Sequence, residues 1–158
     1  MTEAAPVEAA VAIGSNLGDR HAAVAQALER LAPLLEGLRA APPVETAPVG
    51  VDEPQPDFLN TVAIGRTRLP PRALLDALLG IELALGRTRP YRLAPRVIDL
   101  DLILYGEAIV DEPGLQIPHP RFRERLFVLD PLADLVPDWV DPVTGLTVRA
   151  LRDRARSR

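Results

Sequence analysis

The sequence predicts an α+β fold of the ferredoxin-like type, with a βαββαβ core whose antiparallel sheet has helices packed on it. Three observations support this prediction: the order of strand-like and helix-like segments, the helical spacing of apolar residues, and the turn residues between segments. A length of 158 residues suits one domain, and 47% hydrophobic residues are enough for a sizeable core. We expect a single domain over residues 1–158, with extra strands and a helix after the core.

The first two elements are a buried strand and an amphipathic helix. Val7 to Ile13 is an apolar run that ends at the turn residues Gly14, Ser15 and Asn16. After Asp19, apolar residues recur at helical spacing and form one stripe, made of Val24, Leu28, Leu31 and Leu35. Asn16 or Asp19 is the expected cap of this helix.

Two strands follow, and a long loop separates them. Arg39 to Thr46 resembles a short strand that Pro42 and Pro43 interrupt, which is typical of an edge or bulged strand. Phe58 to Thr67 is the firmer strand of the two. The segment Ala47 to Asp57 between them is too long and too rich in proline for a tight hairpin, so we expect a structured functional loop.

The second helix and the last core strand complete the βαββαβ order. Pro70 and Pro71 open the helix, since proline is tolerated in a first turn, and Gly86 ends it. Ile98 to Tyr105 is the next strand. From Asp111 a proline-punctuated loop leads to three further elements: a helix near Leu126 to Leu135, a weak hairpin around Pro142 to Gly145, and a C-terminal helix over Arg149 to Arg158.

The composition excludes several classes of protein. The net charge of −4 argues against the broad basic surface that nucleic-acid binding needs. The chain has no cysteine, and all 18 basic residues are arginine, which excludes thiolate zinc sites, P-loops and Schiff-base chemistry. No stretch approaches the roughly 20 apolar residues of a membrane span. We therefore expect a cytoplasmic protein with no nucleic-acid or membrane partner.

Two aspartates stand two positions apart in the last core strand. Asp99 and Asp101 therefore project from one face of that strand, although their neighbours are apolar. Burying two carboxylates there is costly unless a cation compensates, and a pair of this kind suits Mg²⁺ bound together with substrate phosphates. The alternative is a solvated strand face whose aspartates pair with nearby arginines.

Four arginines precede these aspartates within ten positions. Arg87, Arg89, Arg92 and Arg96 lie in a segment that two prolines break, so we expect a loop. Guanidinium groups grip phosphate oxygens, and cations beside metal-binding carboxylates favour phosphoryl transfer. A solvated basic loop is the alternative reading of the same residues.

Single residues elsewhere add weaker indications. His119 follows a proline on a rigid loop, where its imidazole could donate to a phosphate, although a lone histidine is usually incidental. Phe58 and Phe127 are candidates for stacking on a flat heterocycle, with core packing as the alternative.

Several segments together resemble the 6-hydroxymethyl-7,8-dihydropterin pyrophosphokinase family. Arg92 to Ile103 reads as a basic residue, one position, a small residue, proline, arginine, two positions, and then aspartate, apolar residue, aspartate and two apolar residues. Supporting segments are Ala12 to Gly18, Glu45 to Pro48, Pro56 to Asn60 and Ile117 to Arg121. The resemblance covers about Val11 to Val148.

This resemblance implies a reaction and a set of site residues. The β,γ-pyrophosphate of ATP would pass to the hydroxymethyl group of the dihydropterin, and AMP would be released by a monomeric enzyme of folate biosynthesis. Two Mg²⁺ ions would bind Asp99 and Asp101, with Arg87, Arg92 and Asp101 as catalytic residues. The implied ATP contacts are Glu82, Arg89, Arg96, Leu102, His119 and Arg125. The implied pterin contacts are Thr46, Ala47, Val49, Phe58, Asn60 and Phe127.

Two rival interpretations start from the same sequence features. A ferredoxin-like sensing or RNA-binding module has the same element order, but the acidic balance and the scarce aromatic residues count against it. A sugar-nucleotide transferase with an Asp-x-Asp metal site would normally need a larger nucleotide-binding domain.

Overall fold

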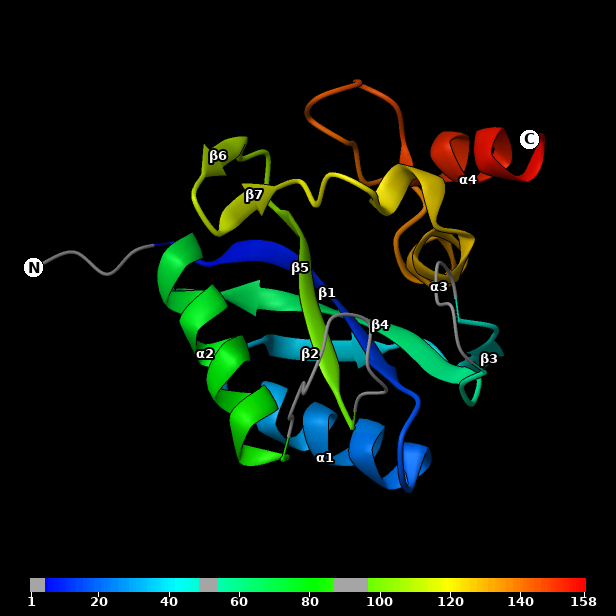
Figure 1. Cartoon of the computed structure of the whole chain (residues 1–158). Helices are drawn as coiled ribbons and strands as arrows, with labels where there is room; N and C mark the ends of the chain where they lie inside the picture. The colour runs from blue at the N-terminus through cyan, green and yellow to red at the C-terminus, as the bar shows by residue number, and fades with distance from the viewer. Residues whose placement is uncertain (1–4, 49–53, 87–96) are drawn as a thin grey trace, which may run out of the picture.

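The computed structural model describes residues 5–48, 54–86 and 97–158. Its main sheet has the strand order β2 (Glu36–Ala40), β4 (Phe58–Thr67), β1 (Val7–Ser15) and β5 (Asp99–Tyr105), and every neighbouring pair is antiparallel. A fifth strand, β3 (Val44–Thr46), pairs with the start of β4. Figure 1 shows the two middle strands, β4 and β1, flanked by the outer ones. The predicted α+β class and antiparallel sheet are confirmed.

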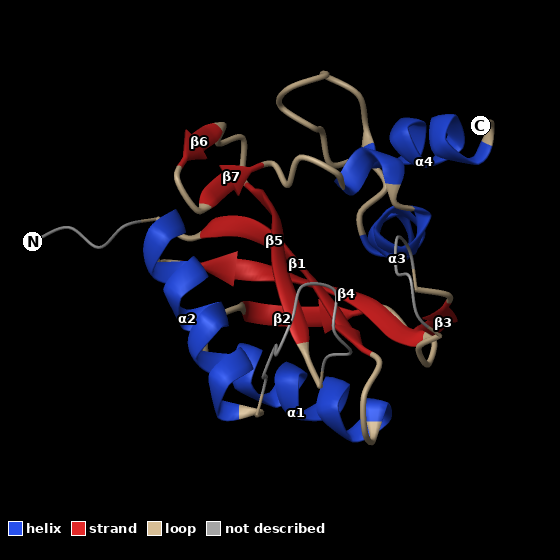
Figure 2. Ribbon diagram, in the orientation of Figure 1, coloured by secondary structure: helices blue, strands red, loops and turns tan. Residues whose placement is uncertain are grey.

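Helices cover both faces of this sheet, which Figure 2 shows in red between the blue helices. On one face, α1 (Arg20–Leu31) and α2 (Pro71–Ala84) bury Val11 and Ile13 of the central strand. On the other face lie the 3₁₀ turn η1 (Phe122–Glu124), α3 (Leu126–Leu135) and α4 (Val148–Arg156). Because β1 is covered on both sides, its sequence is almost continuously apolar rather than alternating.

The structure corrects two predicted element boundaries. The first helix ends at Leu31 instead of continuing to Leu35, because Pro33 cannot continue a helix. The strand predicted over 39–46 is two short strands, β2 and β3, separated at Pro42 and Pro43. Both pair with β4, so the long strand carries one partner toward each end.

A hairpin after β5 was not predicted. Strands β6 (Val110–Glu112) and β7 (Leu115–Ile117) pair with each other in a region that the sequence indicated as loop. Gly114, with φ of 77°, makes the turn in a conformation that favours glycine. Three-residue strands are too short to produce a detectable alternation, which explains the error.

The C-terminal region follows the prediction closely. The expected hairpin is a single bridge between Val140 and Thr147, and the last helix begins at Val148 with Thr147 as its cap. Within the described ranges, no helix is long and apolar enough to span a bilayer.

Candidate active site

A row of three residues runs across the sheet from β4 to β5. Gly14 on the central strand pairs with Asn60 of β4 on one side and with Asp99 of β5 on the other. Neighbouring strands are roughly 4.8 Å apart, so Asn60 and Asp99 are separated by roughly 10 Å across the glycine. The row therefore holds an implied pterin contact, Asn60, and a predicted metal ligand, Asp99.

Gly14 lets the Asn60 and Phe58 side chains lie close to the central strand because it has no side chain. A Cβ atom at position 14 would lie 2.9 Å from the Asn60 Oδ1 atom and 3.4 Å from the Phe58 ring. Any larger residue would therefore displace the Asn60 side chain. Gly14 and Ser15, predicted to be turn residues, belong instead to β1, and Gly14 shapes the site.

The turn after β1 fixes the loop beside this row. Asp19 caps α1 by accepting a hydrogen bond from the Ala22 backbone N–H at 3.0 Å. Of the two predicted caps, Asn16 and Asp19, the structure has Asp19. Asn16 instead donates to Gln55 Oε1 at 3.0 Å and to the Pro56 carbonyl at 3.3 Å. Asn16 therefore ties the proline-rich loop to the end of the central strand.

Two of the candidate pterin residues, Thr46 and Phe58, lie beside Asn60. The Asn60 amide donates to the Thr46 hydroxyl, and Thr46 is paired with Phe58 in the ladder between β3 and β4. Ala47 follows as an exposed residue. Phe127 is in the first turn of α3, and the Arg125 guanidinium carbon lies 5.6 Å from the centre of its ring.

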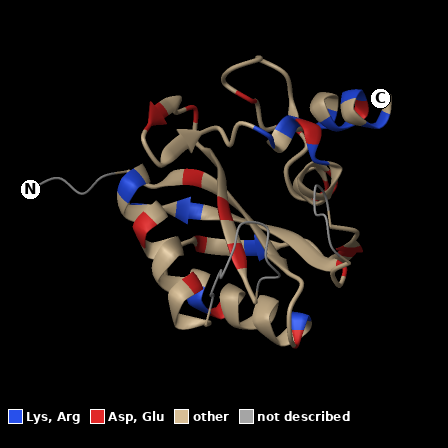
Figure 3. Ribbon diagram, in the orientation of Figure 1, with Lys and Arg blue, Asp and Glu red and all other residues tan. Residues whose placement is uncertain are grey.

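Asp99 and Asp101 lie on the edge strand β5, on the face away from α1 and α2. Both are partly exposed, whereas Leu100 and Leu102 between and after them are buried against the two helices. This alternation confirms that the two carboxylates share one face of the strand. Figure 3 shows the acidic residues following β5 and reaching the β6–β7 hairpin.

Glu82 of α2 supports the strand from the side. Its side chain is only 3% exposed, and its Oε2 atom accepts a hydrogen bond from the Leu100 backbone N–H at 2.7 Å. Leu100 stands between the two aspartates, so this buried carboxylate holds the backbone that carries both of them. A nucleotide contact of Glu82 stays a prediction.

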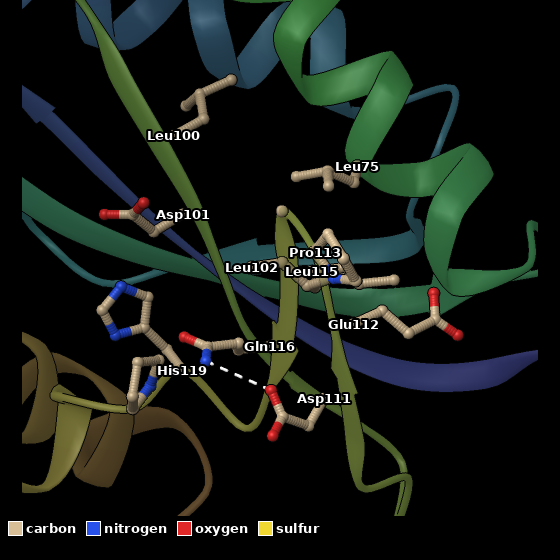
Figure 4. Close-up of a pocket in the computed structure, with 12 residues that line it drawn as sticks. Leu75, Leu100, Asp101, Leu102, Asp111, Glu112, Pro113, Leu115, Gln116 and His119 are labelled. Carbon is tan, nitrogen blue, oxygen red and sulfur yellow. Dashed lines mark hydrogen bonds between the residues drawn. The ribbon is translucent and has the colours of Figure 1, made fainter.

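A cavity of about 700 Å³ lies beside Asp101. Its wall is partly apolar, with Leu75 of α2, Leu100 and Leu102 of β5, and Leu115 of β7. Its polar side includes Asp101, Gln116 and His119, and Figure 4 shows Asp101 and His119 on the same side of β5. The volume is within the range of small-ligand sites.

The β6–β7 hairpin forms much of this cavity, and its contribution was missed in the sequence. Residues 111–116 all line the cavity, and Gln116 donates to the Asp111 carboxylate at 3.3 Å. The apolar wall residues Leu75 and Leu115 were missed as well. Predicting these residues would have required the pairing of Val110 with Ile117. Three-residue strands are too short for that pairing to be recognised from the sequence.

The pKa of His119 is lowered from 6.5 to about 4. Burial is the largest cause, since it disfavours the imidazolium form. The positive charges of Arg125 and Arg121 lower the pKa further, while the Asp99 carboxylate works in the opposite direction. Neutral His119 is therefore the form present at neutral pH.

We expect this shift to make the stability of the protein depend on pH. Between pH 6.5 and about 4 the unfolded chain binds a proton at His119 that the folded chain does not, so stability falls as the pH is lowered through this window. A histidine-detected NMR titration should give a midpoint near 4 for His119. Assignment by a His21→Gln variant is the control, and an ordinary midpoint near 6.5 would contradict the structure.

Several predicted site residues lie outside the described residues: Val49, Arg87, Arg89, Arg92 and Arg96. Of the others, Asp101, Leu102 and His119 meet at the cavity, and Thr46, Phe58 and Asn60 meet at the other end of the row. Within residues 5–48, 54–86 and 97–158, no three acidic or histidine side chains form a metal-binding group. Two carboxylates completed by substrate phosphates are nevertheless a donor set that fits Mg²⁺.

Relatives of known name identify the class of protein. A 2-amino-4-hydroxy-6-hydroxymethyldihydropteridine pyrophosphokinase of Pseudomonas aeruginosa is 44% identical over 133 residues, covering 81% of this chain and 80% of that protein. The protein of the same name from Methylorubrum extorquens is 45% identical over 139 residues, covering 87% and 86%. Both of these relatives are named as pyrophosphokinases, which are transferases.

The family model for 7,8-dihydro-6-hydroxymethylpterin-pyrophosphokinase matches residues 10–137, and the chain belongs to this family. A crystal structure of wild-type Plasmodium falciparum HPPK-DHPS shares the fold, with a TM-score of 0.79 and 14% identity over 100% of this chain. The match covers 46% of that chain. The pyrophosphokinase of Synechocystis is 48% identical over 95 residues, which are 60% of this chain and 49% of that protein. The chain thus spans about half the length of some relatives.

Proposed function

We propose that this chain transfers the β,γ-pyrophosphate of ATP to the hydroxymethyl oxygen of 6-hydroxymethyl-7,8-dihydropterin and releases AMP, as a step of folate synthesis. The observation that carries the proposal is the row Asn60, Gly14 and Asp99. The candidate pterin contact Asn60 and the candidate metal ligand Asp99 stand on either side of Gly14 in this row. Family membership and the printed names of the relatives support the same reaction.

The cavity beside Asp101 is the proposed nucleotide site. Its leucines offer an apolar wall for the purine, and its Gln116 and Asp111 side chains offer polar atoms for the base edge. The triphosphate would then extend along β5 toward Asp99 and Asp101. His119 would contact a phosphate oxygen as a neutral hydrogen-bond donor.

Asp99 and Asp101 would hold two Mg²⁺ ions together with the phosphates. Bound there, the ions would neutralise phosphate charge and polarise the phosphorus that is attacked. Asp101 would serve both the nucleotide and the acceptor, since it lines the cavity and stands next to the row. The catalytic assignment of Arg87 and Arg92, and the ATP contacts of Arg89 and Arg96, remain predictions from the sequence.

The dihydropterin is proposed to lie at the other end of the row. The Asn60 amide can both donate to and accept from the pterin ring, and its bond to Thr46 fixes its orientation. Phe58 and Phe127 would supply aromatic faces on the two sides of the pterin ring. Ala47 and Val49 would complete the contact from the loop that Asn16 anchors.

The residues act mainly by alignment. The hydroxymethyl oxygen attacks the β-phosphorus, the bond from that phosphorus to the α,β-bridging oxygen breaks, and AMP leaves with that oxygen. The hydroxyl proton passes to solvent or to the Asp101 carboxylate. Holding the acceptor in line with the leaving oxygen supplies much of the rate, since a fixed geometry replaces a rare encounter.

An assay of product stoichiometry tests the proposal. Purified protein with ATP, Mg²⁺ and 6-hydroxymethyl-7,8-dihydropterin should yield AMP and pterin pyrophosphate in equal amounts, and omission of the pterin should abolish AMP release. ADP in place of AMP would indicate single phosphoryl transfer. The absence of pterin-dependent AMP would contradict the proposed function.

We further infer a monomer that works in the cytoplasm, with ATP and the pterin as its ligands. The net charge of −4 supports the absence of a nucleic-acid partner. Light scattering during size-exclusion chromatography should give a mass near 17.1 kDa. A mass of twice that value would contradict the monomer.

A further inference from the structure

A buried aspartate near the C-terminus makes an unusually complete set of hydrogen bonds. Asp141 is 0% exposed, and Arg123 donates to both of its oxygens, from Nε at 2.5 Å and from Nη2 at 3.0 Å. The Val143 backbone N–H and the Thr144 hydroxyl donate to the same carboxylate at 3.0 Å and 2.7 Å. Burial alone would raise the pKa of Asp141, but these bonds outweigh it and hold the pKa below its usual value.

Asp141 also closes the turn in which it stands. Its backbone N–H donates to the Leu146 carbonyl at 2.9 Å, and its carbonyl accepts from the Gly145 N–H at 2.8 Å. The bridge between Val140 and Thr147 ties the base of this turn. The carboxylate is therefore presented from a rigid loop rather than from a mobile one.

Arg123, the partner of Asp141, belongs to η1, between two candidate nucleotide residues. His119 donates its backbone N–H to Ile103 of β5 at 3.0 Å, and its carbonyl accepts from the Phe122 N–H at 3.3 Å. At the other end, the Arg125 N–H donates to Phe122 at 3.2 Å. Figure 1 shows this yellow segment running from β7 to α3, next to the C-terminal helix α4.

The pair between Arg123 and Asp141 spans two parts of the chain that are 18 positions apart. A buried ion pair adds little net stability over apolar packing, because both charges are desolvated, but its bidentate geometry specifies orientation. Residue 141 also lies beyond residues 10–137 that the family model matches, and it lines neither the cavity nor the row.

We propose that Asp141 is a positioning residue that acts through Arg123 on the turn η1, and thereby holds His119 and Arg125 at the nucleotide site. The inference rests on the proposed function, since it assigns the nucleotide to that side of the sheet. Asp141 itself touches no substrate.

The test compares Asp141→Ala, Arg123→Ala and the double variant with the wild-type protein. We expect the KM for ATP to rise about tenfold in each, the KM for the pterin to change less than twofold, and the double variant to equal the single ones. Arg156→Ala is the matched control, because Arg156 and Asp130 form a surface pair at 2.8 Å in the same C-terminal region. That control should leave both KM values unchanged.

Calorimetric binding of a non-hydrolysable ATP analogue separates this inference from the proposed function. The dissociation constant should rise about tenfold in the variants even if turnover is not measured, and the His119 NMR resonance should shift. Arg123→Gln, which keeps the size of the side chain, serves if the alanine variants do not fold. Unchanged analogue affinity in folded variants would overturn the inference, whereas wild-type protein without pterin-dependent AMP release would overturn only the proposed function.

Discussion

Replacing Asp101 with alanine is expected to lower pterin-dependent AMP release by at least about a thousandfold, and Asp99→Ala should do the same. Each substitution removes oxygen ligands from the proposed Mg²⁺ site. Without a carboxylate, the phosphates hold the ions less firmly. The fold should survive, since both side chains are partly exposed and their removal leaves no cavity in the core.

The measurement is AMP formation at saturating ATP and Mg²⁺, together with the thermal unfolding midpoint of each variant. Asp134→Asn is the control, because Asp134 is an exposed aspartate on α3, away from the cavity lining. Electron paramagnetic resonance of Mn²⁺ with an ATP analogue gives a second readout that does not depend on turnover. A near-normal rate, or unchanged Mn²⁺ binding, in either variant would show that the metal assignment is wrong.

The core of the fold was predictable because its elements are long and strongly patterned. The apolar run of β1, the two helical stripes and the Ile98 to Tyr105 strand each carry enough residues for one period to dominate. The observed strand order agrees with the predicted βαββαβ sequence of elements, since β5 lies beside β1 as that topology requires. The alternation that places Asp99 and Asp101 on one face followed from the same reasoning.

The lining of the cavity could not be predicted in the same way. The β6–β7 hairpin consists of two three-residue strands that are stabilised by tertiary contact. Leu75 of α2 lines the cavity together with this hairpin, so its role could not be predicted before the hairpin was known. Similarly, Gly14 has a steric role that depends on register with Asn60, and register is not encoded in any one strand. Arg123 and Asp141 are 18 positions apart and belong to no local pattern.

Glu82→Ala is expected to destabilise the fold and to lower activity together. The Leu100 N–H belongs to the edge strand β5 and has the Glu82 carboxylate as its acceptor, so the alanine variant buries an unsatisfied donor. The cost should be about 1–3 kcal/mol of unfolding free energy. Turnover should fall as well, because the freed backbone carries Asp99 and Asp101 on either side.

Glu82→Gln separates the two roles that the sequence and the structure give this residue. Glutamine keeps a carbonyl oxygen that can accept from Leu100, so it should retain most of the stability that alanine loses. Urea unfolding measures the free energies, and the exchange rate of the Leu100 amide proton reports the bond directly. Glu29→Ala, an exposed change on α1, controls for the loss of an acidic residue.

The comparison has an outcome for each possibility. Fast Leu100 exchange in Glu82→Ala, with slow exchange and near-normal ATP affinity in Glu82→Gln, would identify Glu82 as a support for the metal-binding strand. Slow exchange in both variants would contradict that support. Normal exchange with weakened ATP binding in Glu82→Gln would instead favour the nucleotide contact that the family resemblance implies, because only the charge of the side chain would then have mattered.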